Sequence, residues 1–159
     1  MDIKFNEREL KALEFIQPLT ENTPHSQSTL FDHLYNTFII LKTMGCSEEV
    51  CLAGLYHSVY GTEYFKHKTL EASDEIREYV GEYGENLVKL FCSENRDYMI
   101  MGVGNPTDLP PPVLLDLLFI HFANTYEMNP ESRALQDIEE YIAEVSKEVK
   151  GLLTNDTVH

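Results

Sequence analysis

The sequence predicts an all-α fold, a bundle of amphipathic helices. Apolar residues recur three and four positions apart over most of the chain, as in Leu10, Leu13 and Ile16, and this is the spacing of one helix face. Residues that favour helix starts precede several of these segments, and glycine or proline follows them. No segment alternates apolar and polar residues as a half-buried strand would. The chain has 159 residues, 43% of them hydrophobic, so we expect one domain, residues 1–159, around one core.

Caps and helix breakers divide the chain into seven expected helical segments. Asn6 and Glu9 form a capping pair at the start of the first segment, which should stop at Pro18. The polar tail, residues 154–159, is expected to be frayed. The segments are, in chain order, residues 6–17, 28–44, 47–61, 74–80, 85–92, 113–128 and 131–153.

Composition narrows the classes of partner. The net charge of −15 argues against a nucleic-acid-binding protein, because such proteins need basic patches to displace counterions. No apolar run reaches the about 18 residues of a transmembrane helix, so we expect no membrane partner. The N-terminal residues lack the apolar core of a signal peptide. The three cysteines form no disulfide framework, which favours a reduced, cytoplasmic protein.

Three polar residues stand inside apolar helical segments. His33 lies between core positions of the second segment, His57 follows the apolar run CLAGLY, and Asn124 lies in the most hydrophobic segment. A buried polar group costs about 1–3 kcal/mol unless it is hydrogen-bonded. Three such residues on three helices therefore suggest one shared polar site, since pockets in bundles form between helices. Each residue can also be a hydrogen-bonded core side chain, and that alternative stays open.

Two further histidines are candidates for the same pocket. His121 is one helical turn before Asn124, so both can share a helix face. His25 lies in the loop that enters the His33 segment, where it could close over a pocket or face water. A serine–histidine dyad at Ser58 is not expected, because adjacent helical residues point in different directions and no Gly-x-Ser-x-Gly elbow is present.

The order of these segments resembles the HD-domain superfamily of helical metal-dependent phosphohydrolases, in particular the (p)ppGpp hydrolase branch. The segments that carry the resemblance are HLYNTFIILKTMGCSEEVCLAGLYHSVYGTE, DEIREYVGEYGENLVKLF and LLFIHFANTYEM. They span roughly residues 28–128, about two thirds of the chain. The motif HSVYGT after a CLAGL-type helix resembles the sequences of a small uncharacterised HD-like family, the domain of unknown function 6817.

The resemblance implies a metal site with an altered ligand set. His33 and His57 match the two metal histidines, so they are the expected ligands of a divalent transition metal such as Mn, Fe or Zn. Ser58 and Asn124 stand where the family has metal-binding aspartates. The ligand set therefore has no formal charge, and metal affinity should be lower than in an intact site, because softer metals prefer imidazole to such oxygens.

The same resemblance implies a changed catalytic set. The (p)ppGpp hydrolase branch has an acidic pair shortly after its His-Asp motif, and here those places hold Gly61 and Thr62. Glu63 falls just beyond them and is the candidate catalytic carboxylate. The remaining residues of the implied pocket are His25, Ser58, Thr62, His121 and Asn124.

Three functions follow as expectations. The first is a variant metal-dependent hydrolase that acts on a phosphorylated or nucleotide-like small molecule. The second is a catalytically degenerate HD fold without metal, kept as a binding or interaction module. The third, metal-dependent oxygen chemistry, is less favoured, because HD-superfamily oxygenases are richer in His and Asp ligands than this chain. The sequence leaves the substrate and the oligomeric state open.

Overall fold

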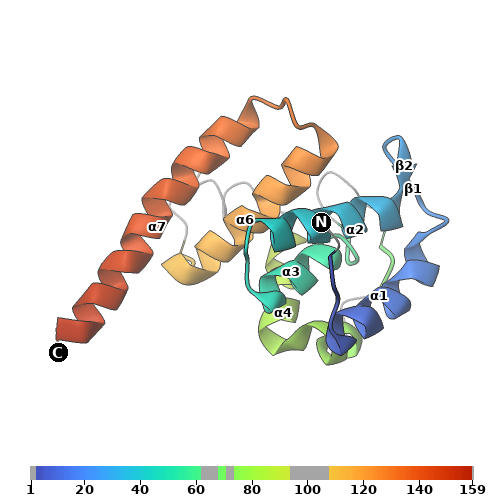
Figure 1. The fold of residues 1–159 in the computed structure, drawn as a ribbon, viewed down its shortest axis with the longest axis horizontal. Helices are drawn as coiled ribbons and strands as arrows, with labels where there is room; N and C mark the ends of the chain where they lie inside the picture. The colour runs from blue at the N-terminus through green and yellow to red at the C-terminus, as the bar shows by residue number, and fades with distance from the viewer. Residues whose placement is uncertain (1–2, 62–67, 71–73, 94–107, 159) are drawn as a thin grey trace.

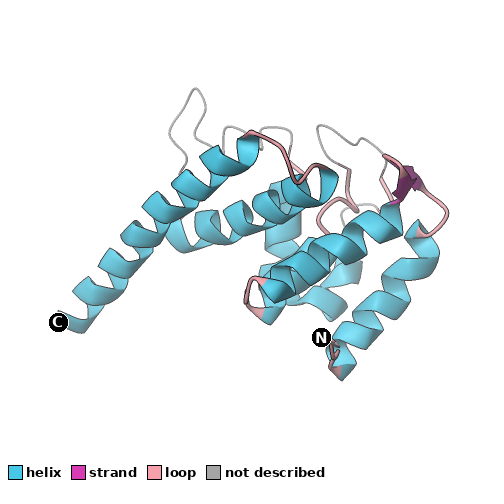
Figure 2. Cartoon of the chain, turned by 45° about the horizontal axis from the view of Figure 1, so that its top comes forward, coloured by secondary structure: helices cyan, strands magenta, loops and turns pink. Residues whose placement is uncertain are grey.

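The computed structural model describes residues 3–61, 68–70, 74–93 and 108–158, and these residues form a helical bundle (Figures 1 and 2). This confirms the all-α prediction. The only sheet in these ranges is one small antiparallel hairpin, in which Pro24 pairs with Thr29 and His25 with Ser28. The elements are α1 (Glu7–Thr20), β1 (Pro24–His25), β2 (Ser28–Thr29), α2 (Leu30–Thr43), α3 (Glu48–Leu55), the 3-10 helix η1 (Asp74–Ile76), α4 (Arg77–Phe91), α6 (Pro111–Met128) and α7 (Ala134–Val158).

The short helix α3 lies at the centre of the bundle. It contacts α1, α2, α4 and α6, and every residue from Val50 to Leu55 is buried. Figure 1 shows α2 and α4 on opposite sides of α3, with α6 crossing behind the end of α2. The side chains that fill the core between these helices are fully buried and include Ile16, Leu34, Phe38, Leu41, Leu52, Tyr56, Leu87 and Phe91.

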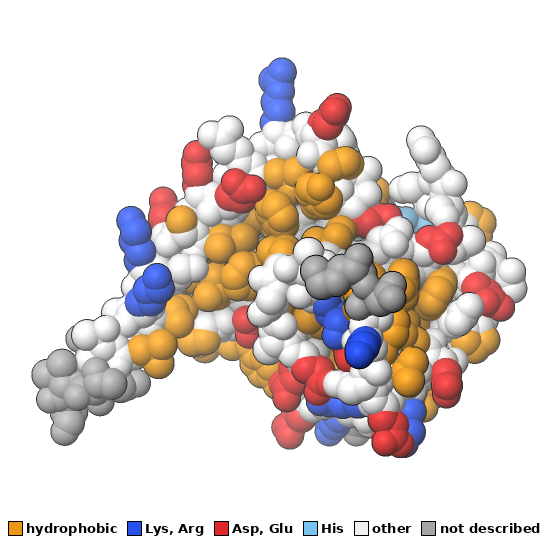
Figure 3. Space-filling view, in the orientation of Figure 1, with side chains coloured by type: hydrophobic (Ala, Val, Ile, Leu, Met, Phe, Trp, Pro, Cys, Tyr) orange, Lys and Arg blue, Asp and Glu red, His pale blue; other side chains and the backbone are white. Residues whose placement is uncertain are grey.

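Helix α7 packs mainly on α6 and extends beyond the rest of the molecule (Figure 1). Leu135, Ile138 and Val145 are buried on the side towards α6, whereas Leu152 and Leu153 near the far end are 46% and 62% exposed. Figure 3 shows hydrophobic side chains gathered over α6 and α7, with charged side chains along the outer edge of α7. No helix among the described residues is long and apolar enough to cross a membrane.

Helix α3 lies close against α2 at Gly54. A Cβ atom on Gly54 would lie 2.2 Å from Cδ1 of Leu41 and 3.7 Å from Cγ2 of Thr37. Leu41 and Thr37 are both fully buried, so neither side chain has open space to move into. The absence of a side chain at residue 54 therefore sets how closely α3 can approach α2.

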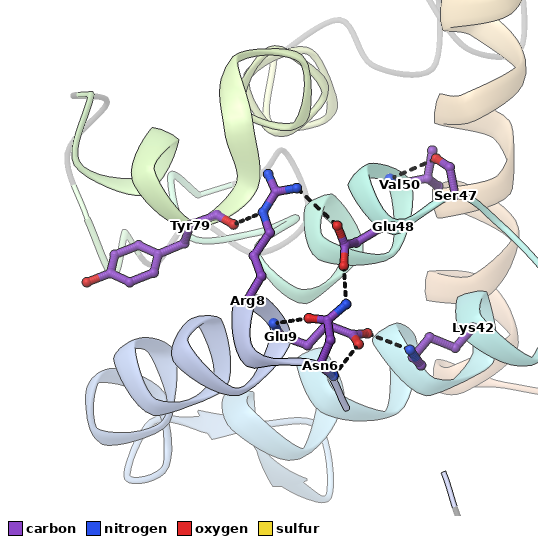
Figure 4. Close-up of polar contacts among 8 residues, drawn as sticks. All are labelled: Asn6, Arg8, Glu9, Lys42, Ser47, Glu48, Val50 and Tyr79. Atoms are coloured by element: carbon purple, nitrogen blue, oxygen red, sulfur yellow. Dashed lines mark hydrogen bonds and ion pairs between the residues drawn. The ribbon is translucent and has the colours of Figure 1, made fainter. Parts of the chain in front are cut away.

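The start of α1 is tied to α3 and α4 by one arginine (Figure 4). Helix α4 is interrupted at Gly81, where φ is 80°, so the helical hydrogen-bond ladder is broken there. The guanidinium of Arg8 donates to the carbonyl oxygen of Tyr79 at 3.2 Å and lies 3.1 Å from the Glu48 carboxylate on α3. The Asn6 side chain also donates to Glu48. These contacts fix α1 against the helices on either side of it.

The same end of α1 is also tied to α2. Asn6 caps α1 in a reciprocal capping box with Glu9, as the sequence predicted. Glu9 is 3% exposed, and its second carboxylate oxygen lies 2.5 Å from Nζ of Lys42 on α2. An ion pair with one buried partner is less screened by solvent than one on the open surface. It therefore helps to hold α2, the helix that carries His33, in place.

Helix α1 is longer than the sequence predicted. It continues through Pro18 to Thr20, although proline lacks the amide hydrogen for one helical hydrogen bond. The Thr20 hydroxyl donates to the carbonyl oxygen of Ile16 at 2.8 Å, and the next amide, of Glu21, donates to Gln17. The last turn is therefore held by two bonds that follow the missing one.

Helix α7 begins later and ends later than predicted. The Asn129 side chain accepts from the amide of Glu131, and the Ser132 hydroxyl accepts from the amide of Ala134. Asn129 thus stabilises the turn between α6 and α7, and Ser132 precedes the first helical residue. The helix then runs to Val158, so residues 154–158 of the tail that was predicted to be frayed are helical, and His159 lies outside the described residues.

We expect Gly54→Ala to destabilise the protein by about 1–3 kcal/mol, because the new methyl group overlaps Leu41 in a packed core. The measurement is urea denaturation followed by circular dichroism. In a Leu41→Ala background the overlap is absent, so the same substitution should cost much less. Equal costs in the two backgrounds would show that contact with Leu41 is not what requires glycine at residue 54.

Candidate functional site

The two histidines predicted to share a site are in direct contact. Nε2 of His33 lies 3.1 Å from Nε2 of His57, and the two side chains belong to residues that are 3% and 1% exposed. The rings meet edge to face, with an interplanar angle of 71°. The sequence-based expectation that helices far apart in the chain bring these residues together is therefore confirmed by the fold.

The sequence predicted that His57 lies in the third helical segment, but in the structure His57 lies in a turn after α3. Helix α3 ends at Leu55, and the chain then makes successive turns up to Gly61, each closed by a backbone hydrogen bond between residues three positions apart. Nδ1 of His57 lies 2.7 Å from the carbonyl oxygen of Gly54. A carbonyl oxygen can only accept, so Nδ1 carries the proton in this contact. The lone pair of a neutral His57 ring is therefore on Nε2, the atom that faces His33.

His33 is oriented by an acidic residue of α6. Its Nδ1 lies 2.5 Å from Oε2 of Glu127, whose side chain is 20% exposed. An ionised carboxylate is also only an acceptor, so Nδ1 of His33 carries the proton. The lone pair of a neutral His33 ring is consequently on Nε2 as well. A carboxylate that orients histidine in this way is common behind metal-binding imidazoles.

Two neutral rings in these orientations direct their lone pairs at each other. Oδ1 of Asn124 lies 3.0 Å from Nε2 of His57 and adds a third acceptor atom. Three acceptors that converge in a buried site repel one another, because the low local dielectric strengthens electrostatic interactions of either sign. A proton or a metal ion placed among them converts this repulsion into attraction. The arrangement is therefore suited to holding a cation.

The hairpin β1–β2 places a third histidine on this pair. The ring of His25 stacks on that of His33, with centroids 4.2 Å apart and an interplanar angle of 18°. His25 is 8% exposed. Burial lowers its pKa, and the neighbouring His33 lowers it further, while Glu127 acts in the opposite direction. His25 is therefore predominantly neutral at pH 7 and covers His33.

The other residues predicted for the pocket have different positions. Ser58 is 3% exposed, and its hydroxyl has no hydrogen-bond partner within the described part of the chain. His121 lies one layer further out: its ring is 6.4 Å from that of Phe91, and Phe91 meets His57 edge to face at 5.2 Å. Thr62 and Glu63 lie outside the described residues, so the predicted catalytic role of Glu63 stays a prediction.

Glu127 is the residue that sequence reasoning missed. It lies three positions after Asn124 on α6, and this spacing puts both side chains on one helix face. The sequence contains that spacing, but the resemblance implies a site residue on this helix only at Asn124, where the HD superfamily has aspartate. The site is therefore not devoid of carboxylate. The carboxylate is that of Glu127, one turn further along α6. It contacts Nδ1 of His33 and does not point between the two rings.

Among the described residues, no three His, Cys, Asp or Glu side chains are grouped so that they could hold a metal ion. Among the residues that the structure describes, the atoms nearest to a metal between the rings would be those of the two imidazoles and the Asn124 amide. One more contact fixes this region: the Cys92 thiol at the end of α4 lies 2.9 Å from the backbone carbonyl oxygen of His57. The turn that carries His57 is thus held from α4 as well as from α3.

Comparison with known proteins gives one match. A family model described as a domain of unknown function (DUF6817) matches residues 16–96, just over half of the chain. No curated protein and no solved structure matches. The matched range includes His33 and His57, whereas Asn124 and Glu127 lie beyond it on α6. The match does not extend to the HD-domain superfamily, so that resemblance stays a prediction.

We expect both His33 and His57 to carry their proton on Nδ1, because Glu127 and the Gly54 carbonyl each require a donor there. Long-range ¹H–¹⁵N correlation spectra of the histidine rings measure this directly. In Glu127→Gln the amide can present either a donor or an acceptor to Nδ1, so the preference should weaken at His33 and persist at His57. A protonated Nε2 on both neutral rings would contradict the assignment.

Proposed function

We propose that this chain, which belongs to the family of the domain of unknown function DUF6817, binds a divalent transition metal between His33 and His57 and uses it to bind a small molecule. The observation that carries the proposal is the pair of Nε2 atoms 3.1 Å apart, each on a ring whose Nδ1 already has an acceptor. The resemblance to the HD-domain superfamily supports the same two residues as ligands.

The residues present fit a metal of this class. Two imidazole nitrogens that share a tetrahedral zinc ion are about 3.3 Å apart, given metal–nitrogen bonds of about 2.0–2.1 Å. The observed separation of 3.1 Å is close to this value. Imidazole nitrogen favours the late first-row metals over magnesium or calcium. Asn124 would contribute the amide oxygen that lies 3.0 Å from His57.

The charge of the site suggests the class of small molecule. His33, His57 and Asn124 carry no formal charge when the rings are neutral, and the carboxylate of Glu127 beside His33 adds one negative charge, so a divalent ion would keep a net positive charge. A phosphate oxygen is a suitable partner for that charge. We therefore propose a phosphorylated or nucleotide-like ligand. A bound metal would supply Lewis-acid activation of water or phosphate, so hydrolysis of this ligand is the reaction we propose.

Glu127 has a positioning role in this proposal. Its carboxylate contacts Nδ1 of His33, on the side of the ring away from His57. It fixes the ring orientation and the tautomer, and its negative charge makes Nε2 a better electron donor. It does not touch the place between the rings. The catalytic carboxylate of a hydrolase would therefore have to come from another residue, for which the sequence offers Glu63.

A second function is favoured by a specific observation. The two Nε2 atoms are 3.1 Å apart, which is a hydrogen-bond distance, so one proton shared between them can satisfy the pair without metal. The chain would then be a catalytically degenerate binding or interaction module whose histidines form a hydrogen-bonded core. The two proposals differ in whether stability depends on metal.

The first test is metal binding by protein purified without chelator. We expect about one metal ion per chain and a rise in melting temperature of several degrees with Zn²⁺ or Mn²⁺, since a ligand that binds only the folded state stabilises it. His57→Ala should abolish both effects. Glu127→Gln should weaken binding about 10- to 100-fold, whereas Glu131→Gln, a matched change of an exposed carboxylate on the following turn, should not.

Sub-stoichiometric metal that is unchanged by His57→Ala, together with an unaltered melting temperature, would reject the metal proposal and leave the metal-free module. If metal binds but a panel of phosphomonoesters and nucleotides is neither bound nor hydrolysed, the metal assignment stands and the ligand class is wrong.

The second test adds the acid that the HD superfamily has at residue 124. Asn124→Asp places a carboxylate beside Nε2 of His57 without changing side-chain size. We expect it to increase the metal-dependent shift in melting temperature, because an anionic oxygen is a stronger ligand than an amide oxygen. In a metal-free module the same change would alter the pH dependence of stability but produce no response to metal.

A further inference from the structure

We propose that the β1–β2 hairpin is a strap that controls access to the histidine pair, and that His25 is the side chain that closes it. The first observation is the stacked contact of the His25 ring with His33 at 4.2 Å. His33 is 3% exposed, although its neighbours on α2 include the exposed residues Asp32 and Asn36. His33 thus lies close below the surface, and His25 is one of the side chains that cover it.

The second strand of the hairpin is anchored to α2. Thr29 caps this helix by accepting a hydrogen bond from the amide of Asp32 at 3.1 Å, and the hydroxyl of Ser28 donates to the carboxylate of Asp32. Both contacts tie β2 to the first turn of the helix that carries His33. The base of the strap is therefore fixed relative to the site.

The first strand is preceded by Thr23, whose amide donates to the carbonyl oxygen of Thr20 at 3.2 Å. Each strand is only two residues long, and the amide of Leu30 donates to the carbonyl oxygen of Thr23 at the open end of the hairpin. Ser26, in the connecting turn, has a φ of 52°, a left-handed conformation that a serine adopts at some energetic cost. A hairpin this short has little stability of its own. The burial and stacking of His25 therefore help to hold its closed position.

A strap of this kind would separate the site from water in the closed state and admit a ligand in the open state. Exclusion of water strengthens every electrostatic interaction inside a site, and loop opening commonly sets the rate of ligand exchange. The inference that the strap covers the histidine pair does not require a metal. Only its consequence for metal exchange rests on the proposed function.

The test is the rate at which diethyl pyrocarbonate modifies His33 and His57, measured by peptide mass spectrometry on the full chain. We expect His25→Ala to speed modification of His33 about tenfold or more, because the covering ring is removed and opening becomes easier. His25→Phe keeps a planar ring that can stack, so its rate should stay within about twofold of the unmodified protein. Gln27→Ala, at an exposed position of the turn, is the matched control and should have no effect.

Equal modification rates in the His25→Ala variant and the unmodified protein, with circular dichroism showing both folded, would overturn the strap. Rates raised equally by His25→Ala and His25→Phe would show that the imidazole itself, and not a covering ring, protects His33, and would overturn the strap as well.

A parallel measurement is the rate at which a chelator removes bound Zn²⁺, which His25→Ala should increase without changing the stoichiometry. If no metal binds to any variant, the proposed function fails while the modification rates still decide the strap.

Discussion

The arrangement of the site depends on the two hydrogen bonds that occupy Nδ1 of His33 and His57. Each ring has only two nitrogens, so an acceptor on Nδ1 decides what the other nitrogen presents. The Gly54 carbonyl and the Glu127 carboxylate make that decision for the two rings. The result is a pair of buried lone pairs at 3.1 Å, which is unfavourable unless a cation is shared between them.

These two hydrogen bonds require the helices to be placed with little freedom. Gly54 allows α3 to approach α2 closely, and the same residue supplies the carbonyl that orients His57. The end of α1 holds α2 through Glu9 and α3 through Arg8. Helix α6 must then lie with Asn124 against His57 and Glu127 against His33. A shift of one turn along α6 would move both side chains by about 5.4 Å, so both contacts would be lost.

The site is assembled from two parts of the chain with different relations to known proteins. The matched family region, residues 16–96, supplies both histidines and the strap. Helix α6, outside that region, supplies the amide and the carboxylate that set the polarity of the site. Its chemistry therefore cannot be read from the family region alone, since His33 acquires its Nδ1 acceptor, and the site its carboxylate, only when α6 packs against α2.

The sequence by itself predicted the all-α fold and most of the helical segments, and it suggested that His33, His57 and Asn124 share one polar site. Helical periodicity and caps such as the Asn6–Glu9 pair are local, so they can be recognised in a few consecutive residues. The HD-like role of the site and the contribution of Glu63 stay predictions. Only the tertiary structure decided that Glu127 orients His33, that His25 stacks on it, and that His57 lies in a turn beyond α3. Those facts depend on how helices distant in sequence are rotated and offset relative to one another. Packing fixes these offsets to within one helical turn, whereas local sequence patterns carry no information about them.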